Sequence, residues 1–152
     1  MYRLTPIVLI SMILSVPITN EQADRVAQNI FIEFSSQSID NYNVSYLDII
    51  NEDNQDLIYA YHLLPKGYIL VSADDTSYPV IGYSFENNLS IHNLPDNFNF
   101  VFNNIKSNIK INSISLSPRS NEISIDWNKY LGDATPTRER NVSPLIDAEF
   151  DQ

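Results

Sequence analysis

Four apolar runs separated by short polar turns fill the middle of the chain, and they limit its fold more than any other feature. Connections this short join neighbouring antiparallel strands, so the stretch predicts a four-stranded antiparallel meander. Gly67 fits the turn between the second and third runs, and Gly82 predicts a close approach of another backbone to the fourth. In the second run both alternating sets of positions are apolar, so we expect helices to cover one face of the sheet. The runs are VSYLDII (44–50), LIYAYHLL (57–64), YILVSA (68–73) and PVIGYSF (79–85).

An amphipathic pattern precedes the runs. Its apolar residues recur three and four positions apart, which predicts a helix from near residue 20 to about Ser35. Thr19 and Gln22 have the spacing of a capping box at the start of this helix. The helix is therefore the first candidate to cover the sheet. Its apolar positions are Ala23, Val26, Ala27, Ile30, Phe31 and Phe34.

A second amphipathic pattern follows the last run. It begins after Pro95, with Asp96 near its start, and a weaker pattern predicts a short helix over residues 122–131. The expected fold is α+β: a small antiparallel four-stranded sheet packed by an N-terminal helix and by a second helix after the last strand. The apolar positions of this second helix are Phe98, Val101, Phe102, Ile105 and Ile109.

Residues 1–17 have the pattern of an export signal. Arg3 precedes the apolar stretch LTPIVLISMILSVPI, whose length is typical of a signal peptide and short for a transmembrane span. No A-x-A cleavage motif is present, but Ile13 and Ser15 occupy its two small-residue positions, which places the cut near Ser15 to Pro17. We therefore expect a secreted, periplasmic or cell-envelope protein whose only membrane contact is this signal. An uncleaved anchor is the alternative.

Charge and amino-acid content exclude several functions. The formal net charge is −10, and no cluster of Lys and Arg longer than TRER offsets it, so the chain would repel the phosphates of nucleic acid. The chain contains no cysteine, which excludes disulfides, thiolate metal sites and a cysteine nucleophile. It also lacks a Gly-rich phosphate loop and the G-x-S-x-G motif of serine hydrolases. We therefore expect no catalytic residues, no cofactor and no nucleic-acid partner.

Asp74 and Asp75 are the most conspicuous candidates for an acidic site. They could act as paired carboxylates or bind a metal ion, or they could form a turn between two strands. Adjacent residues on an extended chain point to opposite sides, whereas hydrolytic carboxylates come from separate segments that face a cleft. The segment ADDTSYP also contains short polar side chains that accept backbone hydrogen bonds in turns. We therefore predict a turn and no metal site.

Two histidines and two aromatic residues could also serve a ligand. His62 lies in a predicted strand and His92 in a loop, without the spacing of a metal-binding helix, so we interpret both as surface or packed imidazoles. Trp127 and Tyr130 could stack on a ligand, but their helical spacing favours packing. From the residues alone, the chain is interpreted as an exported acidic α+β module, a binding domain with a C-terminal connector.

Four segments of the chain resemble a known family in their order and residues. They are TNEQADRVAQNIF, GYILVSADDTSYPVIGYS, LPDNFNFVFNNI and VSPLIDAEFDQ. Together they resemble the prodomain of the streptopain-type secreted cysteine peptidases and the related Spi inhibitors. The second segment is the most specific. The last resembles the first residues of the mature peptidase, although Ile146 and Phe150 stand where Leu and often Trp are expected.

The resemblance implies a division of the chain and a function. Residues 1–17 are the signal peptide, 18–131 the Spi-like inhibitor domain, 132–141 a cleavable connector, and 142–152 the start of a missing cysteine peptidase domain. The implied function is that of an inhibitory and folding-assisting propeptide. It blocks the active site of the peptidase until the connector is cut. This chain would have no activity of its own, whereas its full-length parent would be a cysteine peptidase.

The resemblance also implies where contact is made. In streptopain-like zymogens an Asn at the start of the second prodomain helix enters the substrate region, and the segment PDNF places that Asn at Asn97. Pro95 and Phe98 would fix the loop and anchor the helix. A carboxamide can bond to groups of the site without presenting a scissile carbonyl to the thiolate.

The processing region and two alternative functions complete these expectations. The polar segment GDATPTRERN would contain the activating cut, and its candidate residues are Arg138, Arg140 and Asn141. The peptidase partner could be in cis in the parent, or the chain could be a free-standing inhibitor of a separate cysteine peptidase. The third possibility is an exported binding module without a peptidase partner.

Overall fold

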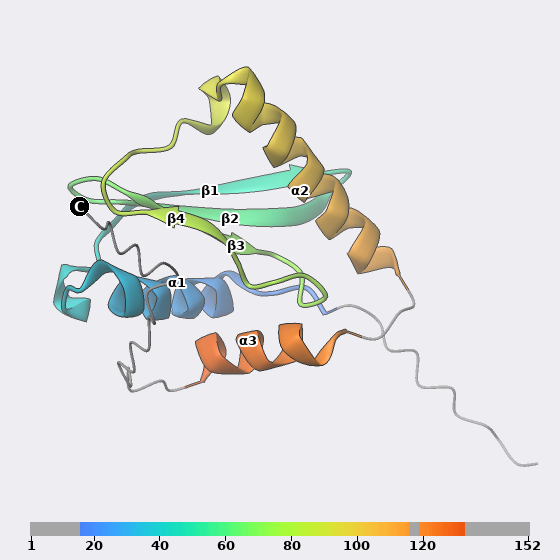
Figure 1. Cartoon of the computed structure of the whole chain (residues 1–152), viewed down its shortest axis with the longest axis horizontal. Coiled ribbons are helices and arrows are strands. Elements are labelled where there is room, and N and C mark those ends of the chain that lie inside the picture. Colours follow the sequence, from blue (N-terminus) through green and yellow to red (C-terminus); the bar gives the residue numbers. More distant parts are fainter. Residues whose placement is uncertain (1–15, 116–118, 133–152) are drawn as a thin grey trace, which may run out of the picture.

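The fold is α+β, as predicted, with a four-stranded sheet between helices (Figure 1). The computed structural model describes residues 16–115 and 119–132. Within these residues, no helix is both long and apolar enough to span a bilayer. The elements in chain order are α1 (Asn20–Ser35), η1 (Ile39–Asn41), β1 (Val44–Glu52), β2 (Gln55–Leu63), β3 (Tyr68–Ser72), β4 (Val80–Ser84), η2 (Ile91–Asn93), α2 (Asp96–Ile114) and α3 (Asn121–Leu131).

The strands form the predicted meander. They lie in the order β1-β2-β3-β4, and each pairs antiparallel with the next. The turn between β1 and β2 consists of Asp53 and Asn54, both left-handed, with φ of 51° and 63°. Two residues with positive φ match the twist of an antiparallel hairpin, and Asp and Asn tolerate that conformation. The strands therefore extend further into the segment NEDNQD than the sequence predicts.

The two glycines of the sheet have roles that differ in part from the prediction. Gly67 lies in the turn between β2 and β3 with φ of +118°, and a Cβ there would lie 2.7 Å from the carbonyl oxygen of Ser84. A close backbone approach thus occurs at Gly67. The same expectation for Gly82 was wrong, because a Cβ added there would meet no atom within 4 Å.

Helix α1 has the predicted bounds and the predicted cap. The N–H of Gln22 donates to Oγ1 of Thr19 at 3.2 Å, and the N–H of Thr19 donates to Oε1 of Gln22 at 2.9 Å. This capping box satisfies two backbone donors at the helix start. Phe34 lies at the edge of the buried face and is 43% exposed; it stacks on Tyr83 of β4. The buried positions are Ala23, Val26, Ala27, Ile30 and Phe31.

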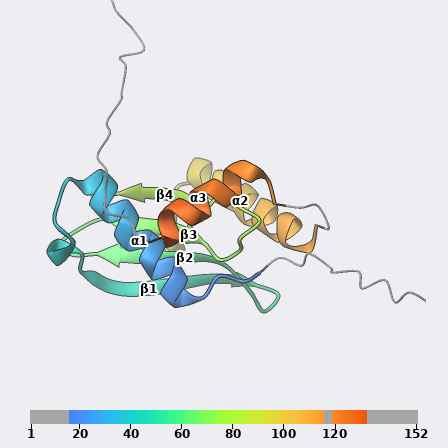
Figure 2. The same ribbon diagram turned by 90° about the horizontal axis from the view of Figure 1, so that it is seen from below.

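Helices α1 and α3 cover the same face of the sheet, and Figure 2 shows them side by side. Trp127 of α3 is 1% exposed, and its Nε1–H donates to the carbonyl oxygen of Ser77 at 2.8 Å. Asn29 of α1 donates to the carbonyl oxygen of Tyr130 at 2.7 Å. The short third helix is therefore confirmed, and Trp127 and Tyr130 serve packing. This first core also contains Tyr59, Tyr61, Leu63, Ile69, Val71 and Ala73 of the sheet.

Helix α2 covers the opposite face of the sheet (Figure 1). The prediction that helices cover one face was therefore incomplete. The alternating residues of β2 and β3 divide between the two cores, which explains why both sets of positions in β2 are apolar. The second core consists of Leu57, Ile58, Ala60, Leu70, Phe102 and Ile109.

Candidate inhibitory site

The start of α2 is the segment that the sequence marks as the inhibitory contact, and the structure places it at the surface. Leu94 is half-buried against the second core, Pro95 is exposed, and the helix begins at Asp96. Pro95 carries no side-chain cap, and its ring presets the backbone for a helix entry. The carboxylate of Asp96 lies in the first turn, where the helix dipole favours negative charge.

Asn97 is an exposed residue of this first turn. The backbone N–H of Phe98 donates to its Oδ1 at 2.9 Å. This bond holds the carboxamide at the helix start, and the NH₂ group of the same side chain can donate to a partner. The structure thus presents the amide group that the resemblance assigns to the inhibitory contact.

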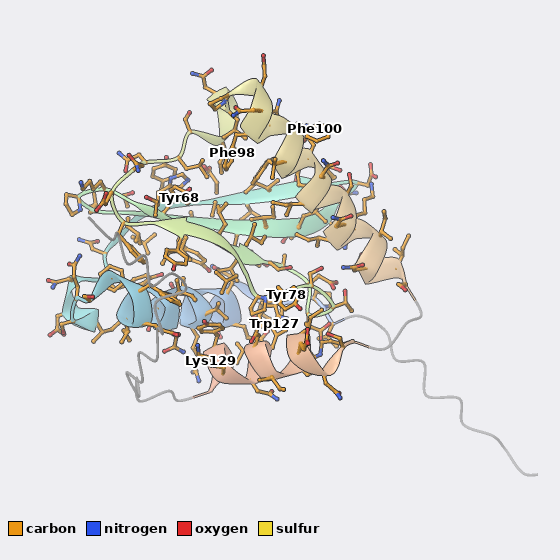
Figure 3. All side chains as sticks on the ribbon, in the orientation of Figure 1. Tyr68, Tyr78, Phe98, Phe100, Trp127 and Lys129 are labelled. Carbon is orange, nitrogen blue, oxygen red and sulfur yellow. The ribbon has the colours of Figure 1, made fainter. Side chains whose placement is uncertain are left out.

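Phe98 points the other way and anchors the segment. It is half-buried against the second core, and its ring stacks on Phe102 with centroids 6.2 Å apart. Figure 3 shows Phe98 between the helix and the sheet, above Tyr68. Anchor and carboxamide are therefore adjacent in sequence but face different surroundings.

Two apolar residues at the start of α2 lie on the surface. Phe100 is 69% exposed and Val101 is 51% exposed. The prediction that Val101 belongs to the buried face was wrong. At 100° per residue the buried row runs through Phe98, Phe102 and Ile109, and Val101 lies to one side of that row, where the sheet does not reach it. Phe100 lies on the opposite side of the helix, and sequence reasoning did not identify it.

The second half of α2 is tied to the β1–β2 hairpin by charged groups. Nζ of Lys106 lies 2.6 Å from Oε1 of Glu52, and Lys110 pairs with Asp53. The hydrogen bond to Lys110 lowers the pKa of Asp53, and the same bond raises the pKa of Lys110. Gln55 donates to Oγ of Ser113 at 2.8 Å. These contacts tie the second half of α2 to the hairpin, while Phe98 packs its first turn against the second core.

Neither of two described hollows in the surface includes the start of α2. One, of about 360 Å³, lies between β4, α2 and α3, and is lined by Tyr78, Val80, Ile81, Ile105, Ile109 and Ile123 with Ser77, Asn108 and Asn112. The other, of about 540 Å³, lies near η1 and the β2–β3 turn. The candidate site is therefore an exposed helix start, a shape that can enter the cleft of another protein.

Asp74 and Asp75 form the predicted turn. Oδ1 of Asp74 accepts the backbone N–H of Thr76 at 2.9 Å, a turn-forming bond. Asp75 pairs with Arg119, with 3.0 Å between Oδ2 and Nη1. The described residues contain no group of three or more carboxylates and imidazoles placed to hold a metal ion.

His62 is a packed imidazole, which is one of the two interpretations that the sequence allows for the histidines. His62 is buried, its ring stacks on Tyr46 with centroids 4.0 Å apart, and its Nε2 lies 3.1 Å from Oδ2 of Asp48. His92 belongs to η2, and its side chain is outside the described residues. The processing candidates Arg138, Arg140 and Asn141 also lie outside them, as do residues 1–15. Those predictions stay predictions.

Comparison with known families identifies the chain. The family model of the Spi protease inhibitor matches residues 15–109, which include α1, the whole sheet and the first part of α2 with Pro95, Asn97 and Phe98. Comparisons with curated proteins and with solved structures find no match. The family model spans more than half of the chain, and a protease inhibitor implies a protease as partner. The chain belongs to the Spi protease inhibitor family.

Proposed function

We propose that this chain is the inhibitory and folding-assisting propeptide of a secreted, streptopain-like cysteine peptidase, and that the start of α2 blocks the active site. Membership of a protease inhibitor family supports the inhibitory role. The observation that carries the assignment of the site is the contrast between two neighbours. Asn97 presents its carboxamide at the surface, while Phe98 holds the same turn against the sheet.

The chemistry of Asn97 suits a residue that occupies a peptidase cleft and survives there. Its Oδ1 is engaged by the N–H of Phe98, and its NH₂ group can donate to a carbonyl or to the imidazole of the site. An amide of this kind presents no scissile backbone bond to the attacking thiolate. Asn97 therefore fills the site without being cleaved.

The surface around Asn97 suits a protein interface. The chain has a formal net charge of −10, but residues 97–105, NFNFVFNNI, carry no charged side chain. Phe100 and Val101 add exposed apolar area to this segment. Charged residues are depleted at the centres of interfaces and aromatic residues are enriched, so the first half of α2 is the part of the helix best suited to contact a partner.

Inhibition assays with variants of Asn97 test the site. The exported chain is titrated against a streptopain-like cysteine peptidase with a fluorogenic peptide substrate. Asn97→Ala and Asn97→Asp should each weaken inhibition about 5- to 150-fold, because a buried interface hydrogen bond is worth about 1–3 kcal/mol. Asn97→Asp keeps the oxygen that accepts the N–H of Phe98 but lacks the NH₂ group. This variant therefore tests the NH₂ donor while the hydrogen bond at the helix start is kept.

Asn108→Ala is the matched control for this experiment. Asn108 is an exposed amide on the same helix, but it lies three turns further on and outside residues 97–105, so its loss should leave the inhibition constant unchanged. Thermal unfolding of all variants shows whether the fold is kept. If Asn97→Ala and Asn108→Ala inhibit equally well, the contact has been assigned to the wrong residue. No inhibition by the unmodified chain at micromolar concentrations would remove the cysteine-peptidase assignment for that enzyme.

The proposal includes a peptidase domain in cis. The resemblance of VSPLIDAEFDQ to the start of a mature peptidase supports this arrangement over a free-standing inhibitor. A tether holds the inhibitor at a high effective concentration over the active site, so cutting residues 132–141 would release it. The coding region after the codon for Gln152 gives the test. A segment with a catalytic Cys and a His supports the arrangement in cis, and its absence favours an inhibitor that acts in trans.

A further inference from the structure

The carboxylate of Asp75 joins two segments that are far apart in the sequence. The backbone N–H of Val16 donates to Oδ1 at 3.0 Å, and Nη1 of Arg119 lies 3.0 Å from Oδ2. The same Nη1 also donates to the carbonyl oxygen of Asp75 at 3.4 Å. The side chain of Asp75 is 19% exposed. Each oxygen of one shielded carboxylate thus binds a different segment of the chain.

The residues that follow Val16 belong to the folded domain. Pro17 forms a bridge with Asp74, and the N–H of Ile18 donates to the carbonyl oxygen of Ala73 at 2.9 Å. Ile18 is 5% exposed in the first core. A cut after Pro17 would remove the bridge, and a cut beyond Ile18 would also remove a buried side chain. Any export cut compatible with this fold therefore lies at or before the Val16–Pro17 bond.

The chemistry of the remaining bonds selects one of them. Ser15 is a small residue, as the position directly before a signal-peptidase cut requires, and Ile13 occupies the other recognition position before the Ser15–Val16 bond. The nitrogen of the Val16–Pro17 bond belongs to the Pro17 ring, which carries no N–H and has a fixed φ, so it is a poor substrate bond. The Ser15–Val16 bond is therefore the best candidate.

We propose that export cuts the Ser15–Val16 bond and that the new α-ammonium group of Val16 binds the carboxylate of Asp75. This inference rests on the proposed export of the chain. Hydrolysis consumes one water molecule and leaves a carboxylate on Ser15 and an amine on Val16, which is protonated at neutral pH. The N–H···O bond seen at 3.0 Å then becomes a charge-assisted bond, which is stronger than a neutral one.

The geometry of Asp75 leaves one of its oxygens for a second cation. Arg119 contributes a positive charge at Oδ2, whereas the neutral N–H of Val16 donates to Oδ1. Tyr78 and Glu122 pair with each other further along the turn. An ammonium group at Val16 would add a positive charge on the other oxygen of Asp75. In the uncut chain, Val16 can bind Asp75 only through its neutral backbone amide. Removal of the signal peptide would therefore stabilise the inhibitor domain by replacing that amide with an ammonium group.

The first test determines the N-terminus of the exported protein. The full chain of 152 residues is expressed in a bacterial host, and the secreted or periplasmic product is analysed by intact mass and N-terminal sequencing. We expect a protein that begins at Val16. A protein that begins at any other residue overturns the assigned cut. If the protein is not exported, the proposed secretion is overturned, and the cut with it. The inhibitory role is independent of this result, because it is assayed with purified protein.

The second test measures the ion pair and does not depend on export. Residues 16–152 contain both cores, and they are produced with Val16 as the first residue or with one Gly before it. The added Gly keeps the N–H of Val16 but moves the ammonium group one residue away. At pH 7 the chain that begins at Val16 should unfold about 2–4 °C higher.

The Asp75→Asn variant completes the comparison. Its carboxamide oxygen can still accept the N–H of Val16 but carries no charge, so the added Gly should no longer change the unfolding temperature. A carboxylate partner raises the pKa of an α-ammonium group above its ordinary value of about 8. The difference should therefore be present at pH 7 and disappear by about pH 10. An equal effect of the added Gly in the unmodified chain and in the Asp75→Asn variant would overturn the ion pair.

Discussion

Asn97 and Phe98 divide two tasks between adjacent residues. Asn97 is exposed, and its carboxamide accepts a local bond from the N–H of Phe98. Phe98 is half-buried and stacks on Phe102. Changes at Asn97 should therefore affect binding before they affect folding, whereas changes at Phe98 should do the reverse.

Phe98 and Phe100 offer a matched pair of substitutions. Phe98→Ala should lower the free energy of unfolding by about 1–3 kcal/mol, because it removes a half-buried ring from the second core. Phe100→Ala should change that free energy by less than about 0.5 kcal/mol, because Phe100 is 69% exposed. Urea denaturation measures both values.

The same pair separates folding from inhibition. Phe100→Ala should weaken inhibition of the peptidase at unchanged stability, because its ring belongs to the exposed surface next to Asn97. Equal inhibition by Phe100→Ala and by the unmodified chain would place the interface elsewhere on the molecule. Equal destabilisation by the two substitutions would contradict the orientation of the helix.

Helices α1 and α2 differ in how strongly they are held, and this explains how well each could be predicted. The sequence defines α1 by local signals, the capping box of Thr19 and Gln22 and a broad apolar face, and the structure matches them. Helix α2 has a narrow buried face with two fully buried residues, Phe102 and Ile109. Its rotation about its own axis depends on the sheet, so the exposure of Val101 could not be deduced from spacing.

The contacts that position the candidate site were also beyond prediction. Lys110 and Asp53 are 57 residues apart, and no local pattern connects them. Both faces of β2 are apolar, so either face could receive α2. Only the tertiary structure shows that α2 packs on the face opposite α1. By contrast, Pro95 and Asn97 were identified by resemblance alone, and the structure adds that both are exposed.

Hydrogen exchange should reveal the difference between the two helices. Backbone amides of α2 should exchange at least about 10-fold faster than those of α1, because a helix that buries few side chains opens locally at low free energy. Hydrogen-exchange mass spectrometry of the free chain measures this. Protection of α2 should rise when the peptidase is bound. Equal protection of α1 and α2 in the free chain would contradict the weak attachment of α2.

At the scale of the whole molecule, tyrosine hydroxyl groups tie α1 to the sheet and to the segment that precedes β1. Tyr42 donates to Oδ1 of Asp24 at 2.9 Å. Tyr61 of β2 donates to Oδ1 of Asn20 at 2.9 Å, at the start of α1. These bonds connect elements that the apolar packing of the first core also holds together. The neutral hydroxyl is the form that donates, so the fold depends on keeping these tyrosines protonated.

Burial raises the pKa of both hydroxyl groups, and the carboxylate of Asp24 raises them further. In the unfolded chain a tyrosine ionises with a pKa of about 10. A folded-state pKa above the unfolded value means that these groups contribute full stability below about pH 10. That contribution is lost as the pH rises above 10, because only the unfolded chain can then release the protons. The molecule should therefore unfold at alkaline pH.

Tyr42→Phe and Tyr61→Phe test this dependence. Each removes one hydroxyl group and keeps the ring, so each should cost about 1 kcal/mol at pH 7.5 through the lost hydrogen bond. Between pH 10 and 11.5, each tyrosine adds up to about 1.4 kcal/mol per pH unit to the loss of stability of the unmodified chain. Each variant should lose stability less steeply by about that amount.

Urea denaturation across this range gives the slopes, and absorbance at 295 nm reports tyrosine ionisation. Lysines titrate in the same range but are unchanged by the substitutions, so the difference in slope isolates the hydroxyl groups. Equal slopes for the Tyr42→Phe variant and the unmodified chain would show that Tyr42 ionises without unfolding.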